Sequence, residues 1–234
     1  MKVGIMQPYF VPYIGYWQLL NLVDKYVIYD DVNFIKGGWI NRNRILLNNQ
    51  VAYFNIPMIG ASSNKKINEV LVNNDVRLAE KNKRRIESAY SKAPYYAEVK
   101  LLLDNILDNK SDNLAEYITA SIRMICDYLD IDTEIIVSSE LDKNNDLTAQ
   151  DKVIDICKRL NATEYYNAVG GMELYSYEEF RRNNISLNFL KTNNITYKQF
   201  QDEFEGNLSI IDVLMFNSKE QVKQLLNEYI IVSE

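Results

Sequence analysis

The chain of 234 residues contains no histidine and only two cysteines. Without an imidazole, the protein cannot build a serine or cysteine triad, a histidine general base or the usual zinc site. Cys126 and Cys157 lie in apolar segments of helical pattern, so buried free thiols are expected in place of a disulfide or a nucleophile. Any proton acceptor would have to be a carboxylate, a tyrosine or a lysine.

Long apolar runs are also missing, since no stretch reaches the ~18–20 residues that span a bilayer. The segment MKVGIMQPYF lacks the apolar centre and cleavage site of a signal peptide. The sequence therefore predicts a cytoplasmic protein without a membrane span. A net charge of −6 argues against nucleic-acid binding, which needs a phosphate-neutralising face. The run KNKRR (81–85) predicts a solvated helix face, with a local phosphate site as the alternative.

The hydrophobic residues, 47% of the chain, alternate between two kinds of pattern. β-Branched and aromatic runs predict strands at 2–7, 25–32, 51–58, 133–139, 162–171 and 185–191. Apolar positions at helical spacing predict helices at 13–23, 76–92, 97–109, 113–129, 148–160, 172–180, 208–216 and 218–228. This order predicts a single α/β domain, 1–234, with a Rossmann-like parallel sheet and a mainly helical insertion at about 75–130.

Polar, aromatic and glycine residues follow the predicted strands. Ligands of an open parallel sheet bind beyond the carboxyl ends of its strands. We therefore expect the segments 7–18, 30–44, 138–139 and 167–171 to line one cleft. The candidate residues at these strand ends are Gln7, Tyr9 and Tyr13, then Asp30, Asp31, Asn33 and Lys36, then Ser138 and Ser139, and finally Asn167, Gly170 and Gly171.

The segment 30–44 carries the densest set of reactive groups. Asp30 and Asp31 could serve as a general base or as Mg²⁺ ligands, or they could cap the strand exit. Lys36, Arg42 and Arg44 could bind a phosphate or a carboxylate, and arginine favours bidentate geometry.

Glycine pairs and a tryptophan leave alternatives open. Gly37-Gly38 would let backbone N–H groups approach an anion, or would form a plain hairpin turn. Gly170-Gly171 could form an anion-binding nest or only a tight turn. Trp39 could pack in the core or stack on a sugar or base.

The opening, MKVGIMQPYFVPYIGYWQLLNLVDKYVIYDDVNFIKGGWINRNRIL, closely resembles the WbqC-like family of bacterial proteins. The resemblance continues through YSKAPYY (90–96), IIVSSEL (135–141), YYNAVGGMELY (165–175) and YKQFQDEFEGNLSIIDVLMFN (197–217). Members of that family occur among genes for O-antigen and other surface polysaccharides. The resemblance therefore implies work on a nucleotide-linked or lipid-linked sugar.

A weaker resemblance links Tyr13-Ile14-Gly15-Tyr16 to the nucleotidyltransferases that carry H-x-G-H after their first strand. In those enzymes the histidines contact nucleotide phosphates, and the resemblance implies that Gly15 permits a nucleotide to approach closely. Tyrosine donates a hydrogen bond but brings no positive charge. A nucleotide pocket is thus more strongly implied than nucleotidyl transfer.

Together these observations predict an enzyme of surface-polysaccharide biosynthesis that transfers an acyl or aminoacyl group to the amine of a nucleotide-linked amino sugar. Asp30 or Asp31 would accept the proton, and Tyr13, Tyr16 or backbone N–H groups would stabilise the oxyanion. The diphosphate would be held by Lys36, Arg42 and Arg44, the ring would stack on Trp39, and hydroxyl groups would be read by Asn41, Asn43 and Asn167.

The further binding residues of this site would be Gln7, Tyr9, Gly15, Ser138, Ser139, Gly170 and Gly171. The acyl donor stays open among a carrier protein, coenzyme A and an aminoacyl-adenylate, and no cofactor or metal is specified. The alternatives are a nucleotide-activating enzyme and a non-catalytic nucleotide-sugar binding protein.

Overall fold

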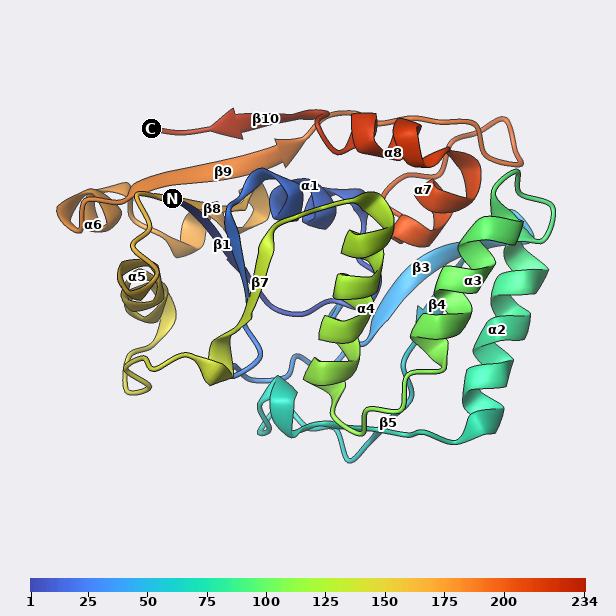
Figure 1. Ribbon diagram of the computed structural model, residues 1–234, viewed down its shortest axis with the longest axis horizontal. Coiled ribbons are helices and arrows are strands. Elements are labelled where there is room, and N and C mark those ends of the chain that lie inside the picture. The colour runs from blue at the N-terminus through green and yellow to red at the C-terminus, as the bar shows by residue number, and fades with distance from the viewer.

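A six-stranded sheet forms the centre of the computed structural model, which describes residues 1–234 (Figure 1). Its strand order is β10 (Tyr229–Val232), β9 (Ser186–Thr192), β8 (Glu164–Ala168), β1 (Lys2–Met6), β2 (Lys25–Ile28) and β7 (Glu134–Val137). All neighbours pair in parallel except β10, which runs antiparallel to β9. The predicted α/β fold with a mainly parallel sheet is confirmed.

Helices cover both faces of the sheet because successive strand residues point to opposite sides. Val3 and Ile5 of β1 join a smaller core cluster under α5 (Ala149–Arg159) and α6 (Tyr177–Arg182). The opposite face carries a larger cluster with α1 (Ile14–Leu22), α4 (Leu114–Leu129), α7 (Ile210–Phe216) and α8 (Lys219–Leu225). The fold is therefore a three-layer sandwich with unequal outer layers.

The chain changes direction at the middle of the sheet. From β1 it moves through β2 to β7, with α1 and α4 on one face. It then returns to β8, beside β1, and continues to β9 with α5 and α6 on the other face. Such a reversal leaves a crevice beyond the carboxyl ends of the two central strands, where ligands of open α/β sheets bind.

A long insertion separates β2 from α4. It contains the hairpin β3 (Arg42–Leu47) and β4 (Gln50–Asn55), the short pair β5 (Met58–Ile59) and β6 (Leu71–Val72), the 3₁₀ turn η1 (Ile67–Glu69), and the helices α2 (Val76–Tyr90) and α3 (Tyr96–Leu107). Figure 1 shows α2, α3 and α4 side by side. The three helices predicted between 76 and 129 are confirmed.

The strand predicted at 51–58 was wrongly placed in the parallel sheet. β4 pairs antiparallel with β3 in a separate two-stranded sheet. Asn48 and Asn49 have φ angles of 51° and 61°, and two consecutive residues of positive φ make the tight hairpin turn that suits the twist of paired strands. The turn therefore pairs β4 with β3, the strand that precedes it in the sequence.

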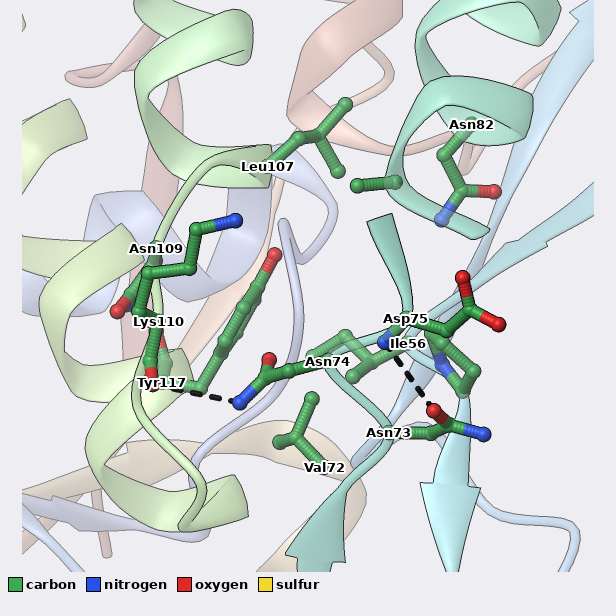
Figure 2. Close-up of a pocket in the computed structure, with 12 residues that line it drawn as sticks. Ile56, Val72, Asn73, Asn74, Asp75, Asn82, Leu107, Asn109, Lys110 and Tyr117 are labelled. Carbon is green, nitrogen blue, oxygen red and sulfur yellow. Dashed lines mark hydrogen bonds between the residues drawn. The ribbon is translucent and has the colours of Figure 1, made fainter. Parts of the chain in front are cut away.

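Polar contacts join the insertion to the segment before α4 (Figure 2). Figure 2 shows the Asn74 amide donating to the Lys110 carbonyl at 3.3 Å and the Asp75 N–H donating to the Asn73 side chain at 3.2 Å. The cavity between these groups measures about 20 Å³, which suits about one water molecule. This junction therefore packs the insertion and offers no room for a substrate.

None of the helices combines the length and the apolar character that crossing a bilayer requires. The single domain with a helical insertion at about 75–130, the cytoplasmic location and the absence of nucleic-acid binding stay predictions.

Candidate functional site

Five residues predicted from the sequence meet in one hollow beyond the carboxyl end of β1. We call it the aromatic cavity; it measures about 190 Å³ and is lined by Tyr9, Pro12, Tyr13, Trp39, Asn43, Arg44 and Asn207. Tyr13 and Asn207 also line a neighbouring hollow of about 290 Å³ at the end of β9. Strand ends and the insertion thus build the cavity together.

Hydrogen-bond donors without partners lie at the aromatic cavity. Tyr13 is the residue before α1; its side chain makes no capping hydrogen bond, and the first turn of α1 holds no acidic residue. The positive end of the helix dipole is therefore not neutralised there. Arg44 donates to the Asn207 carbonyl at 2.9 Å and its guanidinium lies 5.7 Å from the Trp39 ring centre, while its buried Nε has no partner.

Two asparagines predicted to read ligand hydroxyls instead hold the backbone. The Asn43 amide donates to the carbonyls of Phe10 and Val11 at 3.2 and 3.1 Å. Val11 has a φ of 38°, which is costly for a β-branched residue, and these bonds help to keep it there. The buried Asn41 amide donates to the Ile56 carbonyl at 3.3 Å. Both side chains therefore position the cavity wall.

Gly15 does not leave space for a nucleotide. A Cβ atom at this position would lie 2.5 Å from the Tyr13 ring and 2.5 Å from the Thr192 hydroxyl oxygen. Tyr16 is only 2% exposed, and its hydroxyl donates to the Gln7 carbonyl at 3.2 Å. Burial raises the pKa of Tyr16. Gly15 therefore allows close packing within the protein, and Tyr16 is a core residue that cannot reach an oxyanion.

The Gly37-Gly38 turn faces a cation of the protein. Gly37 has a φ of 75°, and the Arg42 guanidinium donates to the carbonyls of both glycines, at 3.0 Å for Gly38. Arg42 also stacks over the Tyr53 ring at 4.5 Å. The turn thus presents carbonyl oxygens to arginine and does not form an anion site. Lys36 is exposed and lines neither this cavity nor the one described next.

A second hollow, which we call the carboxylate cavity, lies beyond the carboxyl ends of β2 and β7. It measures about 460 Å³ and is lined by Asp30, Asn68, Asn113, Ala115, Glu116, Thr119, Ala120, Arg123, Val137, Ser139 and Glu140. Asp30 is 2% exposed and accepts hydrogen bonds from the Ser139 N–H at 2.9 Å, the Ser139 hydroxyl at 2.6 Å and the Asn68 amide at 3.1 Å. Because a carboxylate has about four acceptor positions, one is left for a ligand.

Asp31 belongs to a buried ion cluster with two lysines. Its Oδ2 lies 3.1 Å from the Lys143 ammonium and 2.9 Å from the Lys152 ammonium. Burial alone would raise the pKa of Asp31, but the two lysines hold it at about 2. A general base works best with a pKa near the operating pH. Asp30 and Asp31 have separate partners, and the protein contains no group of three or more metal-ligating side chains that includes them.

The segment 167–171 lines neither cavity. The Asn167 amide donates to the hydroxyls of Tyr165 and Tyr175 at 2.6 and 3.2 Å, and its carbonyl oxygen accepts from the Ala168 N–H at 2.7 Å. Gly170 and Gly171 belong to the 3₁₀ turn η3 (Val169–Leu174), and neither has a positive φ. Ser138 is buried beside the Asp31 cluster. The four predicted segments therefore do not line one cleft. Segments 7–18 and 30–44 contribute to the aromatic cavity, and segments 30–44 and 138–139 contribute to the carboxylate cavity.

Several cavity residues were missed because they lie in the insertion and on an apolar helix. Glu116, Thr119 and Arg123 form a polar stripe along α4, at spacings of three and four residues. A polar stripe on a helix that is otherwise buried is a signal that the sequence does carry. Asn207 and Glu140 have no comparable local pattern.

The model of the WbqC-like protein family matches residues 7–224. The chain belongs to this WbqC-like protein family. It is also similar to the uncharacterized protein Rv1507c of Mycobacterium tuberculosis, with 30% identity over 219 residues that cover 92% of this chain and 93% of that protein. No solved structure matches. The matched range includes every residue that lines the two cavities.

We predict that Gly15→Ala lowers the free energy of unfolding by about 1–3 kcal/mol, because the added methyl group must displace Tyr13 or Thr192. Gly170→Ala is the matched control, since no atom lies within 4 Å of its added Cβ. Urea denaturation of both variants measures the difference. Equal stability of the two variants would contradict the close packing at Gly15.

The Asp31 cluster predicts a pH dependence of stability. The pKa of Asp31 in the folded protein, about 2, lies below its ordinary value of 3.8. The stabilisation is therefore present above pH 3.8 and is lost as the pH falls towards 2. Asp31→Asn should remove this part of the acid dependence and also lower stability at pH 7, because two buried lysines lose their counter-charge.

Urea denaturation at several pH values between 7 and about 2 measures both effects. Asp202→Asn, which changes an exposed carboxylate, is the control and should keep the slope of the native protein. The cluster would be of no consequence for stability if Asp31→Asn showed that same slope.

Proposed function

We propose that this WbqC-like protein is a transferase of bacterial surface-polysaccharide biosynthesis that places an acyl or aminoacyl group on the amine of a nucleotide-linked amino sugar. The aromatic cavity is the observation that carries the proposal. It combines ring faces of Tyr9, Tyr13 and Trp39 with the guanidinium of Arg44 at the start of α1. A nucleotide diphosphate carries a base ring that can stack on these ring faces and an anionic diphosphate that can pair with the guanidinium.

The anion would lie between Arg44 and α1. Backbone N–H groups at a helix N-terminus bind phosphate, and the first helix after the first strand is where doubly wound folds use them. Arg44 adds a charge-assisted donor, because it lines the cavity and only one of its guanidinium N–H groups is used, toward the Asn207 carbonyl. Trp39 is 41% exposed and offers a face for stacking.

The reacting amine would lie in the carboxylate cavity beside Asp30. The amine nitrogen attacks the acyl carbonyl carbon, the new C–N bond forms, and the bond to the donor's leaving group breaks with its electron pair. The proton released from the amine passes to Asp30, which has one acceptor position unoccupied. A nucleotide-linked sugar has two chemically different ends, which suits two cavities at the same edge of the sheet.

Fluorescence tests the binding half of the proposal. Trp17 is fully buried, so a ring that stacks in the aromatic cavity should quench Trp39 alone. Titration with a nucleotide-diphosphate amino sugar should quench the native protein and not Trp39→Phe, and Arg44→Ala should weaken binding about tenfold or more. Lys36→Ala is the control, because it removes an exposed cation outside the cavity. Equal weakening by Lys36→Ala would reject the assignment of the anion to Arg44.

Turnover tests the chemical half. With acyl-coenzyme A, an acyl carrier protein or an aminoacyl-adenylate as donor, mass spectrometry should detect the N-acylated sugar. Asp30→Asn should lower turnover by about 10²–10⁴-fold with quenching of Trp39 unchanged, because the amide cannot take the proton. Asp202→Asn should turn over normally. Tight binding without turnover for any donor would favour the non-catalytic binding protein, and ATP-dependent nucleotidyl transfer would favour the nucleotide-activating enzyme.

A further inference from the structure

The carboxylate cavity is rich in acceptors that no protein donor occupies. Glu140 makes no hydrogen bond to the protein, and Glu116 uses one carboxylate oxygen for the Ser111 hydroxyl at 2.8 Å. Asn68 donates its amide to Asp30 and leaves its side-chain carbonyl free. A ligand that hydrogen-bonds to all of these acceptors must therefore carry several N–H or O–H donors.

Thr119 adds an observation that is independent of the carboxylates. Its side chain is only 7% exposed, yet its hydroxyl makes no hydrogen bond to the protein. A threonine inside a helix ordinarily bonds to a carbonyl one turn earlier or points to solvent. Here the hydroxyl lines a cavity of about 460 Å³, so a group inside that cavity is the available partner.

The charge of the cavity selects a cation. Three carboxylates, those of Asp30, Glu116 and Glu140, line it against the single guanidinium of Arg123. Arg123 donates one N–H to the Ile135 carbonyl at 3.1 Å, and the first N–H groups of α4 are capped by Asn113, so the three carboxylates outnumber the donors that face them. The carboxylates do not form a metal-ligating group. An organic ammonium group is the cation that remains.

We propose that the carboxylate cavity binds a protonated amine carried on a hydroxylated ring, and that Glu116, Glu140 and Thr119 select it over the N-acylated form. The proposal rests on the proposed function for the identity of this amine as the acceptor. The ammonium donates to the carboxylates, and ring hydroxyls meet Thr119 and the Asn68 carbonyl. The ammonium first loses one proton to water, which leaves the neutral amine with the electron pair that attacks the acyl carbon. The second proton, released as the C–N bond forms, passes to Asp30.

Ligand titration followed by amide NMR tests the selection with three sugars that differ at one position: glucosamine, N-acetylglucosamine and glucose. Glucosamine should shift the backbone amides of Thr119, Ala120 and Ser139, and should bind about tenfold more tightly than the other two. Equal affinity for glucosamine and N-acetylglucosamine would overturn the proposal, as would shifts confined to other parts of the chain.

Two variants separate a binding function from a structural one. Glu116→Gln and Thr119→Val should each weaken glucosamine binding about tenfold, whereas Glu173→Gln, an exposed glutamate outside the cavity, should bind normally. Thr119→Val should keep the native Tm, because the hydroxyl has no partner in the protein to lose. A lowered Tm with unchanged binding would make Thr119 structural and overturn its assignment.

The two proposals fail in different ways. If nucleotide-linked sugars neither bind nor turn over, but glucosamine keeps its preference and loses it in Glu116→Gln, the proposed function is wrong and the amine site stands. If turnover is present and Glu116→Gln and Thr119→Val keep the native KM for the amino sugar, the proposed function stands and the amine site is wrong.

Discussion

The buried carboxylate of Asp31 pairs with two lysines and stabilises the carboxyl edge of the sheet. Asp31 follows β2, Lys143 follows β7 and Lys152 lies in α5, so the cluster joins the exits of two neighbouring strands to a helix of one outer layer. Lys143 also donates to the Ser138 carbonyl, which holds the neighbouring Ser139 where it meets Asp30. Removing one member of such a cluster leaves uncompensated charge in the interior. The carboxylate cavity therefore depends on an ion cluster that lies outside it.

The two adjacent aspartates, Asp30 and Asp31, have different partners. Asp30 points to the side of the insertion and α4, where it meets Asn68 and Ser139. Asp31 points to the side of α5, where the lysines lie. The pKa of Asp31 is lowered to about 2 by those lysines, and of the two carboxylates only Asp30 lines a cavity. Asp31 therefore belongs to the ion cluster, whereas Asp30, one residue earlier, is the group proposed to accept the proton.

The insertion completes both cavities. Trp39 and Arg44 come from its hairpin side and Asn68 from its 3₁₀ turn, while the strands contribute Tyr9, Tyr13 and Asp30 at their ends. The reversal of chain direction between β1 and β8 opens the central edge, and the insertion covers one side of it.

The sequence by itself determined the helices at 76–129, the parallel strands of the central sheet, the family and the absence of any imidazole, because periodicity and composition are properties of each segment alone. Tertiary structure alone decided which groups meet. Asp31 and Lys152 are 121 residues apart, and Asp30 and Ser139 are 109 apart. The space at Gly15 is occupied by Thr192. The pairing of β4, by contrast, is set by the local Asn48-Asn49 turn. The partner of a charge or of a glycine depends on distant segments, and a local pattern carries no information about them.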